Sequence, residues 1–319
     1  MPKVFITREI PEKGIKLLKD KSWEVNVGPE GKISDEDLLE GVKGVDAILS
    51  VLTEKIDGKI METAGKQLKI IANYAVGYNN IDVEEAKKRN VMVSNTPGVL
   101  TDAVADHAVG LLLAIAQKII EADKYMRAGK YKAWGPKLFL GADVAKKTLG
   151  IVGLGRVGSA VAQRMSGGFG MNIIYFDVKR NEQIEKEHGF KYMEIDELLK
   201  EADFVSLHTA LTDDTRHLIN LDRLKLMKST ACLINTSRGP IIDEKALVEV
   251  LKEKGIFGAA LDVFENEPEM TPGLVDLENT ILTPHIASAT KETRDKMAEM
   301  AANNVIAALE GQTPPNLVE

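Results

Sequence analysis

The stretch TLGIVGLGRVGSAVAQRM, residues 148–165, decides the fold class of this chain of 319 residues. An apolar run ends at Val152, the glycines Gly153, Gly155 and Gly158 follow in a GxGxxG pattern, and a helical pattern begins at once. Glycine at these positions permits a tight turn, lets the backbone approach a pyrophosphate and brings helix and strand close together. The N-terminus of the helix adds free N–H groups and a favourable dipole for an anion. The stretch therefore predicts a dinucleotide cradle, against the alternative of a glycine-rich turn without a ligand.

The next apolar run, MNIIYFD, supports this prediction because it ends in an acid, Asp177. A carboxylate about 20 residues after the last glycine is placed to hydrogen-bond the adenosine ribose of a dinucleotide. It would repel the 2′-phosphate of NADP, so NAD (NADH) is the expected cofactor and NADP the less favoured one. Lys179 and Arg180 weaken this preference, since either side chain could meet that phosphate.

Composition narrows the class of protein. Hydrophobic residues make up 44% of the chain, which is ample for packed cores, and the net charge of −7 argues against nucleic acid or an anionic membrane as partner. One cysteine, Cys232, excludes an internal disulfide. No apolar run approaches the roughly 20 residues of a membrane span, and the N-terminus lacks a signal-peptide pattern. We expect a globular cytoplasmic protein.

Short β-branched runs alternate with amphipathic stretches along the whole chain, which is typical of parallel α/β architecture. We expect an α/β protein with two doubly wound parallel sheets. Residues 1–99 and 288–319 would form a flavodoxin-like substrate-binding domain, and residues 100–287 a Rossmann domain that binds NAD. A single long apolar helix is expected over residues 101–129. Its apolar surface between 101 and 120 needs cover, which predicts a homodimer.

Four successive apolar strands of the second domain each end in polar residues. Because ligands of doubly wound sheets bind at the carboxyl ends of the strands, these residues are candidates for one site. They are His208 and Thr209, then Thr236, Ser237 and Arg238, then Asp262 and Glu267, and finally His285.

The chemistry of three of these residues suits the reduction of a carbonyl. Arg238 offers a planar fork that matches a carboxylate, and His285 can give or take a proton near neutral pH. Glu267 could hold that imidazole and favour its charged form. Beside a nicotinamide, this set predicts hydride transfer to a small 2-oxo acid, with His285 protonating the oxygen.

Taken singly, each residue has a simpler interpretation. Arg238 could form a surface ion pair, and Glu267 lies in an acidic loop that would usually face solvent. His208 is expected to line the cofactor cleft, and His107 to be a core or interface histidine. Ser288, a small residue after the last strand, would leave room for the nicotinamide. No His/Cys spacing predicts a metal site.

The sequence resembles the D-isomer-specific 2-hydroxyacid dehydrogenases over essentially its whole length. The segments that carry the resemblance are AVGYNNID, GLGRVG with Asp177, LHTALT, INTSRGPIIDEKAL, GAALDVFENEP and LTPHIAS. The resemblance implies that Arg238, Glu267 and His285 are the catalytic trio, and that backbone N–H groups of Val76 and Gly77 hold the substrate carboxylate. It also implies that Thr101, Leu154, Arg156 and Val157 face the cofactor.

Within the family, the segment AWGPKLFLG resembles the glyoxylate and hydroxypyruvate reductases. In that branch the tryptophan, Trp134 here, can reach the substrate site of a neighbouring subunit; packing against its own domain is the alternative. The expected partner is therefore a small 2-oxo or 2-hydroxy acid. A D-lactate-type or other 2-hydroxyacid dehydrogenase, or an NAD-sensing corepressor-like binding protein, are the other functions that the resemblance leaves open.

Overall fold

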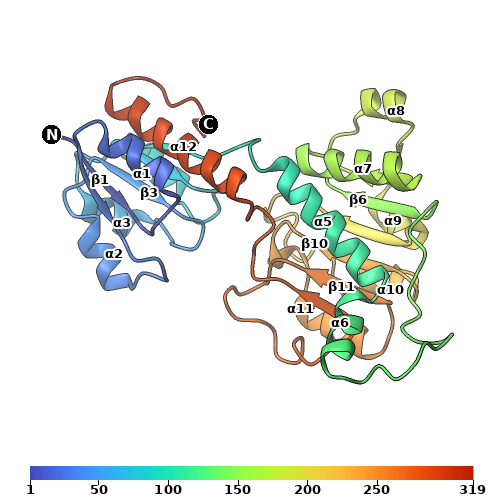
Figure 1. Ribbon diagram of the computed structural model, residues 1–319. Coiled ribbons are helices and arrows are strands. Elements are labelled where there is room, and N and C mark those ends of the chain that lie inside the picture. Colours follow the sequence, from blue (N-terminus) through green and yellow to red (C-terminus); the bar gives the residue numbers. More distant parts are fainter. Residues whose placement is uncertain (319) are drawn as a thin grey trace. The chain divides into compact units, whose positions relative to one another are not determined.

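The computed structural model describes residues 1–318, and the chain divides into two compact units. The first unit contains Met1–Leu100 and Ala289–Glu319, and the second contains Thr101–Ser288. Both crossings between the units lie one residue beyond the boundaries expected from the sequence. Every pairing between named strands is parallel, and Figure 1 shows helices on both faces of the sheets, so the predicted fold class is confirmed.

The first unit is a five-stranded sheet with the order β2-β1-β3-β4-β5. Its strands are β1 (Lys3–Ile6), β2 (Glu24–Val27), β3 (Ala47–Ser50), β4 (Ile70–Asn73) and β5 (Met92–Ser94). Its helices are α1 (Glu12–Lys19), α2 (Asp35–Gly41), α3 (Gly58–Ala64), α4 (Val83–Lys88) and α12 (Lys291–Leu309). Every residue of β3 and β4 is buried, as expected for parallel strands covered on both faces.

Two hydrophobic cores lie on opposite faces of this sheet. One core joins the sheet to α1 and α12, and the other joins it to α2, α3 and α4. The crossing of α1 and α12 is very close, because a Cβ added at Gly14 would lie 2.6 Å from the carbonyl oxygen of Ala298. The C-terminal helix therefore returns to the first unit and completes its core (Figure 1).

The second unit is a seven-stranded sheet with the order β12-β11-β10-β9-β6-β7-β8. Its strands are β6 (Thr148–Val152), β7 (Asn172–Phe176), β8 (Lys191–Tyr192), β9 (Phe204–Leu207), β10 (Cys232–Asn235), β11 (Gly258–Leu261) and β12 (Thr280–Leu282). Its helices are α5 (Thr101–Ala116), α6 (Ile119–Arg127), α7 (Arg156–Phe169), α8 (Glu182–His188), α9 (Ile195–Glu201), α10 (Leu221–Leu226) and α11 (Glu244–Lys252), with a 3₁₀ turn at Gly239–Ile241. The α5 and α7 helices pack in one core, and α9, α10 and α11 in the other.

The prediction of one long helix over residues 101–129 is wrong. The helix breaks between α5 and α6, where Lys118 has a φ of 52°, and the two parts are bent by 65°. The carbonyl of Ala116 at the end of α5 accepts the N–H of Ala142 at 2.8 Å. A Cβ at Gly141 would lie 2.2 Å from that carbonyl oxygen, so the glycine lets the returning chain cap the helix end.

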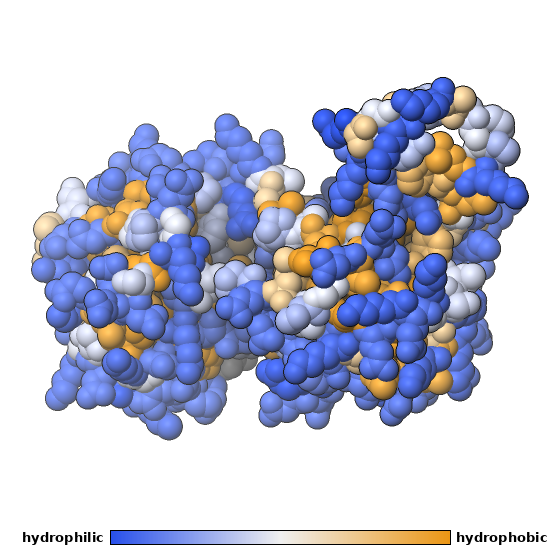
Figure 2. All heavy atoms as spheres, turned by 90° about the horizontal axis from the view of Figure 1, so that it is seen from below, coloured by the Kyte–Doolittle hydropathy of each residue, from blue (hydrophilic) through white to orange (hydrophobic). Residues whose placement is uncertain are grey.

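Much of the apolar surface of α5 is covered by its own unit, and a homodimer through residues 101–120 stays a prediction. Eight of its residues are buried, and six of these belong to the core that α5 shares with the sheet and α7. Exposed apolar side chains instead gather just beyond α5, and Figure 2 shows hydrophobic residues that reach the surface of this unit. We name this set the arm; it consists of Ile119, Ile120, Met126, Tyr131, Trp134, Leu138 and Leu140.

Among residues 1–318, no single helix is long and apolar enough to cross a membrane. The bent pair of α5 and α6 passes that test only when both helices are taken together.

Candidate active site

The candidate site of the second unit lies where the strand order reverses. Strand β6 is flanked by β9 on one side and β7 on the other, so the chain leaves the sheet in opposite directions from this point. Crevices at such switch points, outside the carboxyl ends of the strands, are where doubly wound sheets bind ligands. The GxGxxG loop follows β6 directly and α7 begins at Arg156.

Each glycine of the loop has a distinct structural role. Gly153 has a φ of 95°, and a Cβ there would lie 2.8 Å from the backbone of His208 and Thr209. A Cβ at Gly158 would lie 2.1 Å from the carbonyl oxygen of Gly153, so this glycine lets α7 approach β6. Gly155 differs, since it is exposed and a Cβ would meet nothing within 4 Å. The open space above Gly155 is the place where a pyrophosphate would approach the backbone.

Two buried hydroxyls at the same edge also fit a dinucleotide. Oγ1 of Thr209, after β9, and Oγ1 of Thr236, after β10, have no hydrogen-bond partner among residues 1–318. Buried polar atoms are nearly always paired, so two orphans beside the glycine loop indicate that a ligand completes them. The residues present therefore fit a nicotinamide dinucleotide.

Asp177 lies at the end of β7 and is tied to the glycine loop. Its Oδ2 accepts the N–H of Leu154 at 2.7 Å, and its Oδ1 accepts the N–H of Lys179 at 3.3 Å. The acid thus fixes the turn and keeps a carboxylate at the position where an adenosine ribose is expected.

Arg180, which could have met a 2′-phosphate, is held by another residue. Its Nε and Nη2 each lie 2.8 Å from one oxygen of Glu185, and its guanidinium lies over the ring of Tyr192 at 5.8 Å from the centroid. Tyr175 donates its hydroxyl to the same carboxylate at 2.7 Å. These contacts hold Arg180 toward α8.

His208 follows β9, where its Nε2 lies 2.8 Å from Oγ of Ser206. Burial lowers the pKa of His208 to about 4, so its imidazole is neutral at physiological pH. A neutral ring at the switch point is consistent with a residue that lines a cofactor cleft and does not exchange protons. Ser237 lies after β10, where its hydroxyl donates to Asn235 at 2.8 Å.

His285 and Glu267 meet directly. Nδ1 of His285 lies 2.8 Å from Oε2 of Glu267, and the other oxygen of Glu267 accepts the N–H of Phe264 at 3.0 Å. The carboxylate therefore holds the imidazole by one nitrogen and leaves Nε2 for a ligand. Both side chains keep about a quarter of their surface exposed, which a substrate-facing pair requires.

Arg238 belongs to the same cluster. Burial lowers the pKa of its guanidinium, while the charge of Glu267 acts in the opposite direction, so the two side chains are electrostatically coupled. Nη1 of Arg238 donates to the carbonyl of Ser237 at 2.7 Å, which orients the fork. The second unit thus brings together all three residues that the sequence predicted as a trio.

Asp262 has contacts that the sequence did not indicate. Its side chain is 0% exposed, and its carboxylate accepts the hydroxyl of Thr283 at 2.6 Å and the N–H groups of Ile286 and Ala287 at 2.9 and 2.8 Å. Burial alone would raise the pKa of Asp262, but hydrogen bonds from His107, Thr283 and these N–H groups lower it. Its contact with a cofactor stays a prediction, and its partners within the second unit lie on the loop that carries His285.

That loop needs support, because His285 has a φ of 54°. A left-handed conformation at a non-glycine residue is strained and persists only where its surroundings enforce it. The N–H of His285 donates to the carbonyl of Asp262 at 2.9 Å. His107, on α5, completes the support with Nε2 at 3.3 Å from Oγ1 of Thr283 and 3.5 Å from Oδ1 of Asp262. We expected a core or interface histidine; its place beneath the loop that carries His285 had no sequence signal.

The remaining predicted residues are placed as follows. In the second unit, Thr101 begins α5, Val157 is half-buried in the first turn of α7, and Ser288 is half-buried at the end of the unit. Trp134 is 79% exposed in the arm. In the first unit, Val76 and Gly77 are half-buried in the loop after β4.

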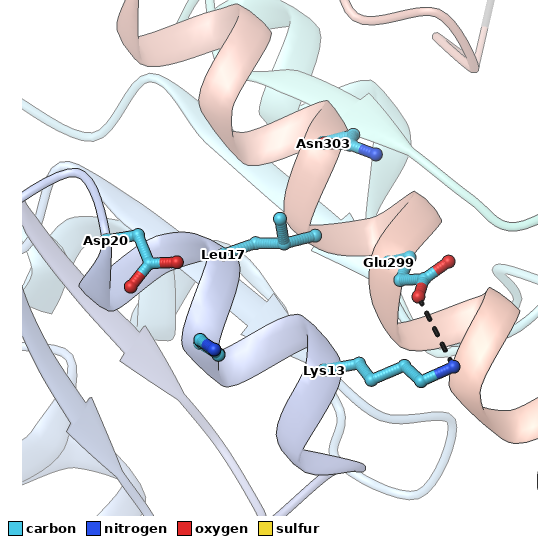
Figure 3. A pocket seen from close by; sticks show the side chains of 6 residues that line it. Lys13, Leu17, Asp20, Glu299 and Asn303 are labelled. Carbon is cyan, nitrogen blue, oxygen red and sulfur yellow. Dashed lines mark ion pairs between the residues drawn. The ribbon is translucent and has the colours of Figure 1, made fainter.

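A shallow groove on the first unit is separate from these residues (Figure 3). It lies between α1 and α12 and is lined by Lys13, Lys16, Leu17, Asp20, Glu299 and Asn303. Nζ of Lys13 is paired with Asp295 at 3.2 Å and with Glu299 at 3.7 Å. Its charged groups lie on helix surfaces, and it is not a candidate for the active site.

Comparison with known proteins agrees with this geometry. The model of the D-isomer specific 2-hydroxyacid dehydrogenase NAD binding domain matches residues 109–287. A glyoxylate reductase of Korarchaeum cryptofilum is 52% identical, over 99% of this chain and 96% of its own. The crystal structure of the TT0316 protein of Thermus thermophilus has a TM-score of 0.93 at 44% identity and covers 99% of this chain and 100% of its own. An NADPH-dependent glyoxylate/hydroxypyruvate reductase of Sinorhizobium meliloti, in complex with NADP and malonate, has a TM-score of 0.86 at 30% identity over 99% of this chain and 96% of its own.

The fold and the site define an oxidoreductase that uses a nicotinamide cofactor. The chain belongs to the D-isomer-specific 2-hydroxyacid dehydrogenase family, and its similarity is to the glyoxylate reductase branch. The predicted family resemblance is thereby confirmed.

Proposed function

We propose that this protein reduces a small 2-oxo acid, glyoxylate or hydroxypyruvate, to the D-2-hydroxy acid with NADH, and that His285 is its acid/base. The observation that carries the proposal is the contact of 2.8 Å between Nδ1 of His285 and Oε2 of Glu267, in the same unit as a glycine loop that fits a dinucleotide. An imidazole whose second nitrogen is held by a carboxylate is a proton donor of fixed orientation.

The proton in this reaction is held at Nε2 of His285. With Nδ1 held by Glu267, Nε2 is the nitrogen left to carry the proton that is transferred. A bound nicotinamide would supply the hydride. The carbonyl carbon gains that hydride and the carbonyl oxygen gains the proton of His285, which together reduce C=O to CH–OH. In the reverse direction His285 accepts the hydroxyl proton.

Arg238 binds the substrate in this account. A guanidinium donates parallel hydrogen bonds to two acceptors, so it suits the carboxylate and carbonyl oxygens of a 2-oxo acid. It stays cationic although burial lowers its pKa, and it polarises the carbonyl toward hydride addition. In the first unit, the N–H groups of Val76 and Gly77 serve as further donors to the substrate carboxylate.

The cofactor preference follows from two carboxylates. Asp177 would repel a 2′-phosphate and accept from the ribose hydroxyls of NAD. Glu185 keeps Arg180 in a bidentate pair, so one of the two cations that could recognise the phosphate is already engaged. The NADPH-dependent relative named above shows that this selectivity differs within the family, and Asp177 and Glu185 support NADH here.

We further propose that the arm is the surface of a homodimer. Seven large apolar side chains of one segment are exposed, and exposed apolar surface on a globular unit marks interaction sites. Trp134, the most exposed of the large apolar residues of the arm, would then contact the partner subunit. Replacing Trp134 by Glu should yield monomers in sedimentation at micromolar concentration, whereas an unchanged sedimentation coefficient would refute this interface.

The function is tested by following NADH oxidation with glyoxylate, hydroxypyruvate, pyruvate and longer 2-oxo acids in turn, then repeating the panel with NADPH. The proposal expects the highest kcat/KM for glyoxylate or hydroxypyruvate with NADH. A higher value for pyruvate would indicate a D-lactate-type enzyme. Clear NADH binding without turnover of any 2-oxo acid would refute the enzymatic proposal in favour of an NAD-sensing binding protein.

A further inference from the structure

The loop after β4 presents an unusual set of backbone contacts in the first unit. Its successive carbonyls at residues 75, 76 and 77 each accept a hydrogen bond from the body of the unit. The donors are the N–H of Thr96 to Ala75 at 2.9 Å, Nδ2 of Asn95 to Val76 at 2.7 Å and Nδ2 of Asn73 to Gly77 at 2.8 Å.

These contacts fix the direction of the N–H groups. In a planar trans peptide the N–H points opposite to the carbonyl of the preceding residue. Holding the carbonyls of Ala75 and Val76 inward therefore turns the N–H groups of Val76 and Gly77 outward. Neither N–H donates to any acceptor within residues 1–318, and both residues are half-buried. Adjacent outward N–H groups form an anion-binding concavity.

One of the two asparagines is itself held rigidly. Asn73 is 0% exposed at the end of β4; its Oδ1 accepts the hydroxyl of Ser50 at 3.1 Å, and its Nδ2 also lies 3.1 Å from Oδ1 of Asn80. Nδ2 of Asn80 in turn donates to the carbonyls of Val51 and Glu54, both at 3.1 Å. The chain of amides links the loop after β4 to the end of β3.

The other asparagine is held through its backbone. The N–H of Asn95 donates to the carbonyl of Asn316 at 3.2 Å, and its own carbonyl accepts Nδ2 of Asn304 on α12 at 3.2 Å. Asn304 is buried, so the C-terminal helix contributes to the placement of Asn95.

We propose that Asn95 is a positioning residue for substrate recognition: it holds the carbonyl of Val76 so that the N–H of Gly77 stays aimed at the substrate carboxylate. Asn73 steadies the same loop at the next carbonyl, that of Gly77. The inference rests on the proposed function, because it assigns a carboxylate to the N–H of Gly77. It explains why the partly exposed amide of Asn95, which could pair with water, is directed at a loop carbonyl.

The test replaces Asn95, which is only partly buried, by Ala. Asn303→Ala is the matched control, since Asn303 is exposed on α12 of the same unit. We expect Asn95→Ala to raise KM for glyoxylate and the dissociation constant of oxalate, a carboxylate that cannot be reduced, by roughly tenfold. KM for NADH should be unchanged and kcat should stay within about twofold, since the transition state keeps its acid and its arginine. A merely structural role would lower Tm without this selective change in carboxylate affinity.

Unchanged oxalate affinity in folded Asn95→Ala, measured by calorimetry with NAD⁺ bound, would overturn the inference. If Asn95→Ala does not fold, Asn95→Ser gives the same comparison with a shorter polar group. The two proposals fail differently: wild-type protein that binds oxalate but turns over no 2-oxo acid refutes the proposed function alone. Wild-type protein that turns over glyoxylate while Asn95→Ala and Asn95→Ser keep its KM refutes the positioning role alone.

Discussion

Nδ1 of His285 lies 2.8 Å from Oε2 of Glu267, and the same carboxylate accepts the N–H of Phe264 at 3.0 Å through its other oxygen. The acid is therefore fixed at both oxygens, and the imidazole that it holds is fixed at one nitrogen. The pair joins the loop after β11 to the end of β12, so the chemistry of the proposed site depends on two segments that only the folded sheet brings together.

Glu267→Gln tests this pair. If the amide oxygen keeps the N–H of Phe264, the amide nitrogen faces Nδ1 of His285 and disfavours the charged imidazole. We expect kcat for glyoxylate reduction to fall about 10- to 100-fold, a part of the 10²–10⁴-fold effect of a general acid, with KM for NADH unchanged. Glu269→Gln, in the same exposed loop, is the control, and a kcat of Glu267→Gln equal to that of the control would remove Glu267 from the mechanism.

Cofactor selectivity can be shifted by releasing Arg180. Glu185→Gln breaks the bidentate ion pair and frees the guanidinium for a 2′-phosphate. We expect the ratio of kcat/KM for NADPH to that for NADH to rise about 3- to 10-fold, in line with a charge-assisted contact partly exposed to solvent. Glu187→Gln, on the same helix, should leave the ratio as it is. Equal ratios in the two variants would show that the ion pair has no part in selectivity.

The support beneath His285 predicts an effect at a distance from the substrate. Thr283→Val keeps the shape of the side chain but removes the hydroxyl that donates to Asp262 and contacts His107. We expect a loss of about 1–2 kcal/mol in the free energy of unfolding, and a fall of kcat of about tenfold because the loop with the acid is less constrained. Thr280→Val, on the strand that ends just before Thr283, removes a hydroxyl hydrogen bond to the carbonyl of Leu277 without touching Asp262. If both variants are less stable and kcat is unchanged in both, the support beneath His285 has no part in turnover.

His208 makes stability sensitive to acid. Its pKa of about 4 in the folded protein lies below the value of about 6.5 in an unfolded chain. Between these values the unfolded chain binds a proton that the folded one does not, so stability from this group falls as pH falls from about 6.5 to about 4. At pH 5 this group lowers the free energy of unfolding by about 2 kcal/mol relative to neutral pH. Urea unfolding of cofactor-free His208→Gln should show a correspondingly gentler loss between pH 7 and pH 5, and parallel curves for both proteins would contradict this.

Much of the fold was predictable because its signals are local. The strands are apolar β-branched runs, and strand, glycines, helix and acid follow one another between residues 148 and 177, so both sheets and the cradle could be predicted. The two residues of β8 are too few to leave a pattern. The break at Lys118 has no glycine or proline to mark it, because the cause is a contact with the returning chain at Gly141 and Ala142.

The candidate site shows the same difference between residues with a local sequence signal and residues defined by distant contacts. Arg238, Glu267 and His285 carry their chemistry in their residue types, and their place at strand ends followed from sheet topology. The roles of His107, Asp262 and Asn95 consist of hydrogen bonds to atoms far away in the sequence, as for His107 and Thr283. Such contacts leave no spacing that a sequence pattern could show.

The central claim is that His285 is the acid for reduction of a 2-oxo acid. The most direct measurement is the single-turnover rate of NADH oxidation by saturating glyoxylate in wild-type protein and in His285→Ala. The account predicts a rate about 10²–10⁴-fold lower in the variant, with the affinity for NADH retained. An undiminished rate in His285→Ala would contradict it.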